Sequence, residues 1–168
     1  MISGMGSEKK SYSIEYASPI GILKITANPK AITNISFVEE KSQKENPNEI
    51  CQQAIQELEE YFAGKREQFT VPLQLQGTEF QQSVWQELQK IPFGRTLSYF
   101  DLSNRLGDVK AIRAVGTANG KNPIAIMIPC HRVVGKNGEL RGYAGGLHRK
   151  EWLLNFEQQF EQKTLFDQ

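Results

Sequence analysis

The sequence predicts an α+β protein in which a small antiparallel sheet with one helix precedes a mostly helical domain. Two observations support this prediction: apolar residues alternate over short stretches between residues 11 and 38, and helical spacing with capping signals dominates after residue 77. The chain has 168 residues, of which 39% are apolar, which is enough for a buried core and argues against disorder. We therefore expect two domains, residues 1–76 and 77–161, and a tail, residues 162–168.

The first domain is predicted from the spacing of its apolar residues. Between Ser11 and Val38 they mostly alternate, with turn signals at Pro19–Gly21 and Asn28–Pro29, which predicts a small antiparallel sheet. From Ile50 to Phe62 the spacing becomes helical, and Gly64 ends the helix. The alternating residues of the sheet are Ile14, Tyr16, Ile20, Ile22 and Ile25.

The second domain begins with three predicted helices. Thr78 can cap the first, and the stretch Ser98–Asp101 can cap a short second helix that closes at Gly107. A third helix from 108 to about 119 follows this glycine directly. Two short helices joined in this way have the outline of a helix-turn-helix, although an ordinary antiparallel helix pair fits the same pattern and is commoner. The apolar stripe of the first helix is Phe80, Val84 and Leu88.

The rest of the second domain is predicted to be less regular. The apolar run Ile124–Ile128, bounded by prolines, predicts a buried extended segment that leads to Cys130. Val133–Gly138 predicts a small hairpin, and Gly142–Gly146 a flexible loop. A last helix begins near Leu147. Its expected core stripe is Trp152, Leu153, Phe156 and Phe160.

The charges of the chain are balanced in total but uneven in position. The formal net charge is +1, yet residues 91–150 contain ten basic and three acidic residues, which gives +7 there and −6 elsewhere. Such asymmetry is a hint of nucleic-acid contact, although a solvated basic face fits equally well. Two cysteines and the lack of a secretory segment predict a reducing, cytoplasmic location, and no apolar run is long enough to span a membrane.

The two cysteines have different surroundings. Cys51 lies on an amphipathic helix, where a small buried hydrophobic residue is the usual interpretation. Cys130 lies between Pro129, which restricts the backbone, and His131 and Arg132, which offer a base and a fixed positive charge. Adjacent Cys and His are weak support on their own, because neighbouring side chains on an extended segment point in opposite directions. The cysteines and histidines match no zinc spacing, so no metal site and no cofactor is predicted.

The stretch Pro129–Val133 resembles the active-site signature of the O6-alkylguanine-DNA alkyltransferases, the methylated-DNA–protein-cysteine methyltransferases. Further motifs follow in the family's order and cover nearly all of residues 77–157. They are Phe80–Trp85, Ile91–Gly94, Leu97–Tyr99, Ala111–Gly116, Asn122–Pro123, Gly142–Gly146 and Lys150–Leu154. The resemblance implies a ribonuclease-H-like first domain and a second domain that contains a helix-turn-helix and the active-site cysteine.

The resemblance also implies a reaction. Cys130 would attack the alkyl carbon of O6-alkylguanine, and of O4-alkylthymine, in DNA. The thioether product is stable in water, so the protein would act once. His131 would activate the thiol through a water and be oriented by Glu157. Tyr99 would give a proton to the departing guanine, and Asn122 would tie its turn to the active-site segment.

DNA would be bound through the minor groove, with the damaged nucleotide flipped out of the stack. Arg113 would fill the vacated place in the duplex. The other predicted DNA contacts are Ala111, Ala114, Gly116, Ser98 and Arg132. The base would be framed by Val133, Tyr143, Ala144 and Gly145. Some relatives have a serine where this chain has Ala144, so a hydroxyl contact is absent here and tolerance of bulky alkyl groups is in question.

The tail offers a separate hypothesis. Gln162, Leu165 and Phe166 resemble the Gln-x-x-Leu-Phe peptides that dock on the bacterial sliding clamp. Alternatively, Leu165 and Phe166 fold back as core contacts.

Three functions from different classes follow from these patterns. The first is a monomeric, nucleoid-associated repair alkyltransferase. The second is a non-catalytic protein that binds alkyl lesions, against which Cys130 argues. The third is a helix-turn-helix regulator. The alanine-rich helix expected from residue 108 to about 119 argues against this hypothesis, because such a helix offers little direct base readout.

Overall fold

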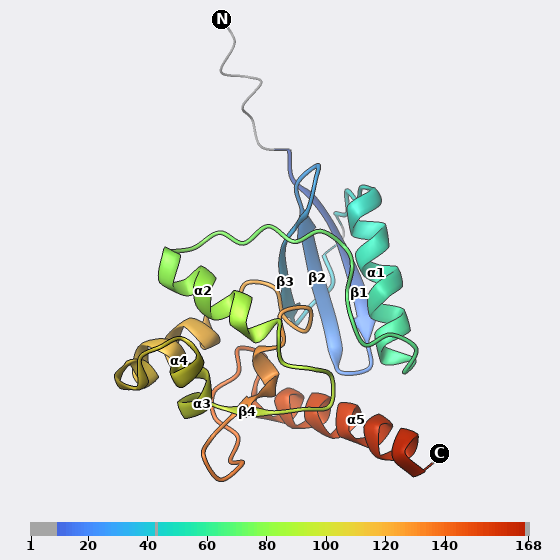
Figure 1. Ribbon diagram of the computed structural model, residues 1–168. Coiled ribbons are helices and arrows are strands. Elements are labelled where there is room, and N and C mark those ends of the chain that lie inside the picture. The colour runs from blue at the N-terminus through green and yellow to red at the C-terminus, as the bar shows by residue number, and fades with distance from the viewer. Residues whose placement is uncertain (1–9, 43, 167–168) are drawn as a thin grey trace, which may run out of the picture. The chain divides into compact units, whose positions relative to one another are not determined.

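The computed structural model describes residues 10–42 and 44–166, and the side chains of residues 161–166 lie outside the description. The chain separates into two compact units, with the division between Gln74 and Leu75 (Figure 1). Each unit has its own buried core. The α+β class predicted from the sequence is confirmed.

The first unit is a three-stranded antiparallel sheet with one helix. Strands β1 (Tyr12–Ser18), β2 (Gly21–Ala27) and β3 (Ile32–Val38) pair in chain order. Helix α1 (Glu49–Phe62) begins where the Asn48 side chain accepts from the Cys51 amide, and it packs on the sheet (Figure 1). The alternating pattern set this register because it places one set of side chains in the core. Buried between sheet and helix are Leu23, Ile25, Ile35, Ala54 and Leu58.

The second unit begins with helices that end where the sequence indicates. Helix α2 (Glu79–Leu88) has a reciprocal capping box between Thr78 and Gln81. Strand β4 (Leu97–Ser98) leads into α3 (Tyr99–Arg105), where the Ser98 hydroxyl accepts from the Asp101 amide. A single 3-10 turn, η2 (Val109–Ala111), then precedes α4 (Ile112–Gly120). These caps satisfy amide groups that a helix leaves without internal partners.

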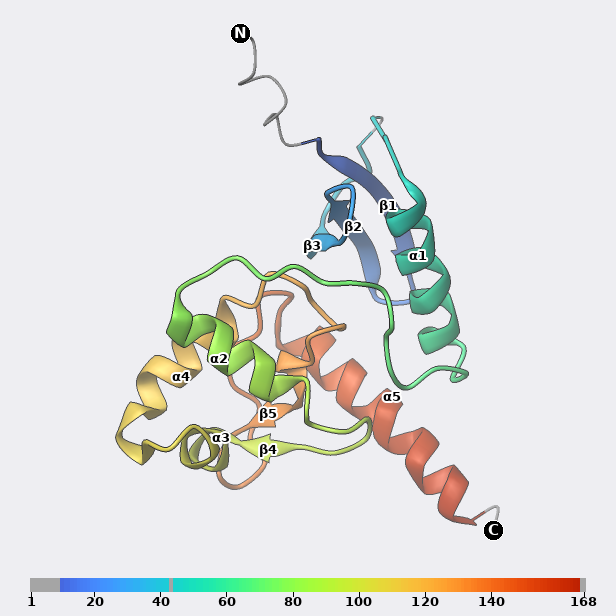
Figure 2. The ribbon, with the colours of Figure 1, turned by 45° about the horizontal axis from the view of Figure 1, so that its top comes forward.

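The last part of the unit carries the predicted nucleophile. A 3-10 turn, η3 (Cys130–Arg132), runs into β5 (Val133–Val134), and α5 (Leu147–Phe166) closes the chain (Figure 2). The Trp85 indole donates to the Ala118 carbonyl at 2.9 Å and so joins α2 to α4. The core around these elements includes Val84, Leu88, Leu102, Val115, Ile124, Val133 and Leu153.

Three local predictions were wrong. Residues 124–128 are buried except for half-buried Ala125, but they form a tight turn, in which Ile126 has a φ of 72° and the Ile128 amide donates to the Ile124 carbonyl. Strand β5 pairs in parallel with the distant β4, not within a hairpin. Phe80 is 40% exposed and so lies outside the core.

Helix α5 also continues to Phe166, so the backbone through the predicted clamp peptide is helical and not extended. None of the helices within the described residues has the length and apolar content to cross a bilayer.

Candidate active site

Cys130 is held in a buried position by a tight backbone path. The turn of residues 124–128 ends at Pro129, and the Cys130 amide donates to the Ile128 carbonyl at 2.8 Å. The Cys130 side chain is almost completely buried. The Asn122 side chain donates to the Ile128 carbonyl at 2.7 Å and accepts from the Ile124 amide at 3.0 Å, so it fixes both ends of this turn. The sulfur position is therefore set by Asn122 and by the turn that it closes.

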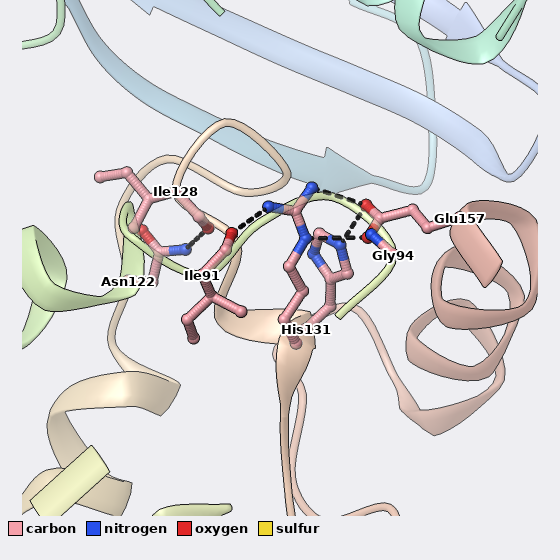
Figure 3. Close-up of polar contacts among 7 residues, drawn as sticks. Ile91, Gly94, Asn122, Ile128, His131 and Glu157 are labelled. Carbon is pink, nitrogen blue, oxygen red and sulfur yellow. Dashed lines mark hydrogen bonds and ion pairs between the residues drawn. The ribbon is translucent and has the colours of Figure 1, made fainter. Parts of the chain in front are cut away.

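One carboxylate organises the residues that follow Cys130. Glu157 on α5 is fully buried, and its Oε2 lies 2.8 Å from Nε2 of His131 (Figure 3). The Arg132 guanidinium donates two hydrogen bonds to the same carboxylate, from Nε at 2.8 Å and from a terminal nitrogen at 2.9 Å. The Gly94 amide adds a weaker bond at 3.3 Å. All four lone-pair directions of a buried carboxylate thus find donors, which such burial requires.

This arrangement fixes the charge states of the site. Burial alone would raise the pKa of the Glu157 carboxyl, but His131 and Arg132 outweigh it and hold that pKa well below its usual range. Burial lowers the pKa of His131, and Glu157 opposes this only in part. His131 is therefore neutral at pH 7, and an ionised carboxylate can only accept, so Nε2 carries the proton. Nδ1 has no hydrogen-bond partner among the described residues, and its lone pair can take up a proton.

The Cys130 thiol experiences opposing influences. Burial raises its pKa, while a hydrogen bond from Asn122 and the charge of Lys150 lower it. Burial has the larger effect, so the resting group is a thiol and needs a base before it can act as a nucleophile. His131 follows Cys130 directly in the chain, and its Nδ1 has no hydrogen-bond partner among the described residues. The site therefore holds a buried thiol, a neutral imidazole and a carboxylate that orients the imidazole.

A pocket of about 900 Å³ opens beside these residues. It lies between the start of α3, helix α4 and the loops on either side of Arg141. Tyr99 and Tyr143 line it, and burial raises the pKa of both phenols, with the charge of Cys130 adding to the effect. Helix α4 lines the pocket at Gly116 and Gly120 and also contacts the cysteine segment, because the Asn119 side chain donates to the Cys130 carbonyl at 3.4 Å. Also on the walls of the pocket are Ser98, Ile112, Gly116, Gly135, Arg141 and Ala144.

Comparison with known proteins agrees with this geometry. Residues 79–159 match the model of the 6-O-methylguanine DNA methyltransferase DNA-binding domain, and residues 12–75 match that family's ribonuclease-like domain. A methylated-DNA–protein-cysteine methyltransferase of Methanosarcina acetivorans is 44% identical, over 87% of this chain and 97% of its own. The chain belongs to the O6-methylguanine-DNA methyltransferase family.

Solved structures of this family agree in fold. The crystal structure of the Mycobacterium tuberculosis O6-methylguanine methyltransferase matches with a TM-score of 0.81 at 41% identity, covering 89% of this chain and 94% of the other. A structure of the M. tuberculosis protein in complex with DNA matches with a TM-score of 0.78 at 42% identity, covering 89% and 93%. The likeness therefore spans both units of this methyltransferase.

Helix α4, which is predicted to enter the minor groove of DNA, presents a small, exposed surface. Arg113 and Ala114 on α4 are exposed, while Ala111 and Gly116 are half-buried. Ala118, the next small residue of the pattern, is buried against α2. The Ser98 hydroxyl is occupied as the cap of α3. Arg113 is thus available to a partner, and the contact surface of α4 ends before Ala118.

Arg132 requires a correction. It was predicted to contact DNA, but it is only 5% exposed, and its third polar contact is a 2.7 Å bond to the Ile91 carbonyl. With all its nitrogens directed inward it cannot reach a phosphate. Arg132 instead compensates the charge of Glu157. Val133 and Gly145 are likewise buried, so only their backbone groups can frame a base.

Two site residues were missed by the sequence analysis. Lys150 is completely buried next to Tyr99, although a lysine in a basic segment is normally a surface residue. Asn119 is buried on α4 and donates to the Cys130 carbonyl at 3.4 Å. Lys150 could have been found from the sequence, because it is the first residue of the family motif Lys150–Leu154. Among the described residues, no cluster of His, Cys, Asp or Glu could hold a metal ion.

The role of Arg132 can be tested by unfolding. Arg132→Met leaves the Glu157 charge buried without its main partner, so we expect a loss of about 3–5 kcal/mol in the free energy of unfolding. Arg113→Met, at an exposed site, should change it by no more than about 0.5 kcal/mol. Urea denaturation followed by circular dichroism measures both. Equal, small effects for the two variants would contradict the buried position of Arg132.

Proposed function

We propose that this methyltransferase repairs DNA by moving an alkyl group from O6 of guanine, and from O4 of thymine, to the Cys130 sulfur. The observation that carries the proposal is the buried Cys130 thiol beside the His131–Glu157 pair, at the side of a pocket lined by Tyr99 and Tyr143. A non-catalytic lesion-binding protein would have no use for a cysteine at this position followed by a carboxylate-oriented imidazole. Each chain acts once, because water does not cleave the thioether.

The reaction balances over these groups. Nδ1 of His131, directly or through a water, takes the thiol proton. The sulfur then forms a bond to the alkyl carbon as the carbon–oxygen bond breaks. The electron pair of that bond passes to the guanine, which is a poor leaving group as an anion, so the Tyr99 hydroxyl supplies a proton. His131 returns its proton to Tyr99 through solvent. The imidazolium formed on the way is stabilised by Glu157, as general-base chemistry requires.

The damaged base reaches Cys130 by leaving the duplex. A stacked guanine cannot enter a pocket beside a buried thiol, so the nucleotide must flip, at a cost of a few kcal/mol. Helix α4 carries exposed Arg113 and Ala114, and its small residues permit close approach to the minor groove. Arg113 then occupies the place of the flipped base. The base is framed by the Val133 carbonyl and by the loop of Tyr143, Ala144 and Gly145.

All of the named residues come from one unit of one chain, so the protein acts as a monomer on DNA, at the nucleoid in the cytoplasm.

A second partner is proposed from the tail. Gln162, Leu165 and Phe166 have the spacing of a sliding-clamp peptide. Because α5 is helical through Phe166, docking as an extended peptide would unwind its last turn. The side chains of this segment lie outside the described residues.

Transfer to Cys130 is measured by intact-protein mass after incubation with duplex DNA that contains O6-methylguanine. We expect one added methyl group per chain and none in Cys130→Ala. Cys51→Ala is the matched control and should react as the wild type does, because Cys51 lies in the core of the first unit. A folded wild-type protein without an adduct would disprove the transfer.

The role of Arg113 is separated from chemistry by changing the substrate. Arg113→Ala should slow methyl transfer from duplex DNA by about tenfold to a hundredfold, the equivalent of roughly 1–3 kcal/mol of flipping energy. Transfer from free O6-methylguanine base should stay unchanged, since nothing has to be flipped. Lys90→Ala, which removes an exposed cation of the same unit, serves as the control. Equal losses on both substrates would count against Arg113 acting in flipping.

Clamp docking is tested by titrating the full-length protein with a purified bacterial sliding clamp in a calorimeter. Binding in the micromolar range is expected, and Leu165→Ala with Phe166→Ala should weaken it at least about tenfold by removing both apolar anchors. Gln159→Ala, at an exposed position earlier on α5, should have no effect. No heat of binding at high micromolar protein would rule out the clamp as a partner.

A further inference from the structure

Three exposed apolar side chains lie on α3, η2 and α4 of the second unit. Phe100 is the second residue of α3, Val109 begins η2 and Ile112 begins α4, and they are 49%, 41% and 37% exposed. Among the described residues, Phe80 and Leu147 are the other large apolar side chains that reach this exposure. A single exposed apolar residue is ordinary, but several on one small surface indicate a contact site.

The fold brings these three side chains onto one surface. Helix α3 contacts both η2 and α4, and it lies beside α4 in Figure 2. Val109 and Ile112 are three residues apart along a 3-10 turn and its cap, where such side chains stand one above the other. Phe100 and Ile112 line the same pocket. We call Phe100, Val109 and Ile112 the apolar patch.

Charge gives this part of the chain little attraction for DNA. Residues 98–116 contain three basic and two acidic residues, and their formal sum is +1. Electrostatic affinity for DNA grows with the number of phosphates that cations neutralise, so α3, η2 and α4 gain little from it. An apolar contact is the contribution that these elements can add. The five charged residues, all exposed, are Asp101, Arg105, Asp108, Lys110 and Arg113.

The partner that fits the apolar patch is the minor groove of duplex DNA. Sugars and base edges there offer apolar atoms, and proteins that bind this groove frequently insert apolar side chains between base steps. The patch is continuous with Arg113 and Ala114, the exposed residues of α4 that the proposed function places in the groove. A base step next to a flipped nucleotide has already lost a stacking partner, so an apolar side chain can cover it at little further cost.

We propose that the apolar patch packs on the sugars and base edges of duplex DNA beside the flipped nucleotide, with Phe100 as its main contact. The proposal deepens the DNA binding of the proposed function and rests on it. Phe100 is the largest and the most exposed of the three side chains. All three are positioning residues, because they hold the duplex while Cys130 and His131 carry out the transfer.

Apolar and ionic contacts respond differently to salt. A cation that binds a phosphate releases counterions, so its share of the affinity falls as the salt concentration rises. Burial of apolar surface releases no counterions and is not weakened by salt. Loss of Phe100 should therefore weaken DNA binding by the same factor at every salt concentration.

The test is fluorescence anisotropy of a labelled duplex that contains O6-methylguanine, titrated with the full-length protein between about 50 and 200 mM salt. Every protein carries Cys130→Ala, so that transfer does not disturb the equilibrium. Phe100→Ala removes the main contact, and Phe100→Leu keeps an apolar side chain there. Phe80→Ala, which removes an exposed phenylalanine from α2, is the matched control.

Phe100→Ala should raise the Kd for the duplex about tenfold, by the same factor across the salt range, because the burial of a large apolar side chain is lost. Phe100→Leu should recover most of the affinity, and Phe80→Ala should bind as the parent protein does. With Cys130 intact, Phe100→Ala should slow methyl transfer from duplex DNA at subsaturating protein. Transfer from free O6-methylguanine base should stay unchanged, since no duplex has to be held.

Four results would overturn the proposal. They are an unchanged Kd in Phe100→Ala, an equal loss in Phe80→Ala, a loss that varies with salt as that of an ionic contact does, and equal slowing of transfer from duplex and from free base. The last result would make Phe100 only a wall of the pocket.

Sedimentation equilibrium examines the other possible partner of the apolar patch. A wild-type dimer that Phe100→Ala converts to monomers, with the affinity for DNA unchanged, would assign the patch to a second copy of the chain and overturn the proposal. Absence of any methyl adduct on the wild-type protein would instead defeat the proposed function, whatever the anisotropy shows.

Discussion

The second unit depends on the burial of a single carboxylate. Glu157 accepts from His131, from two nitrogens of Arg132 and from the Gly94 amide, so α5 is fastened to η3 and to the turn that precedes β4. A buried carboxylate without such donors would take up a proton or disrupt the fold. The same contacts that make its burial tolerable also orient the imidazole next to Cys130. Stability and chemistry therefore share one group.

Burial, assisted by Arg132, lowers the pKa of His131 and keeps it neutral. A carboxylate paired with an imidazole alone favours the protonated imidazole, which has no lone pair to offer. The bidentate guanidinium already neutralises Glu157, and burial then keeps His131 uncharged. The adjacent positions 130, 131 and 132 thus hold a buried thiol, a neutral imidazole and the cation that pairs with the carboxylate bound to that imidazole. The 3-10 turn lets His131 and Arg132 reach the same carboxylate.

Sequence reasoning succeeded where local physics decides the structure. The caps at Thr78 and Ser98 and the alternation of β1 to β3 follow from short-range hydrogen bonding and from a period of two. It failed where the partner is distant in sequence. The parallel pairing of β5 with β4 and the φ of 72° at Ile126 are imposed by packing, and no local signal marks them. The identity of Glu157 as the partner of His131 came from family resemblance, not from spacing.

The basic segment shows the same limit in its charges. Residues 91–150 total +7, and this whole charge would face solvent only if every charged side chain were exposed. Two of the ten cations, Arg132 and Lys150, are interior, so the outward charge of this segment is nearer to +5. Exposed Arg113 lies in high dielectric, where the interactions of its charge are screened by salt. Lys150 is buried, where screening by salt is weak. Residues of one charge type in one segment therefore lie in two different electrostatic environments, and burial decides which.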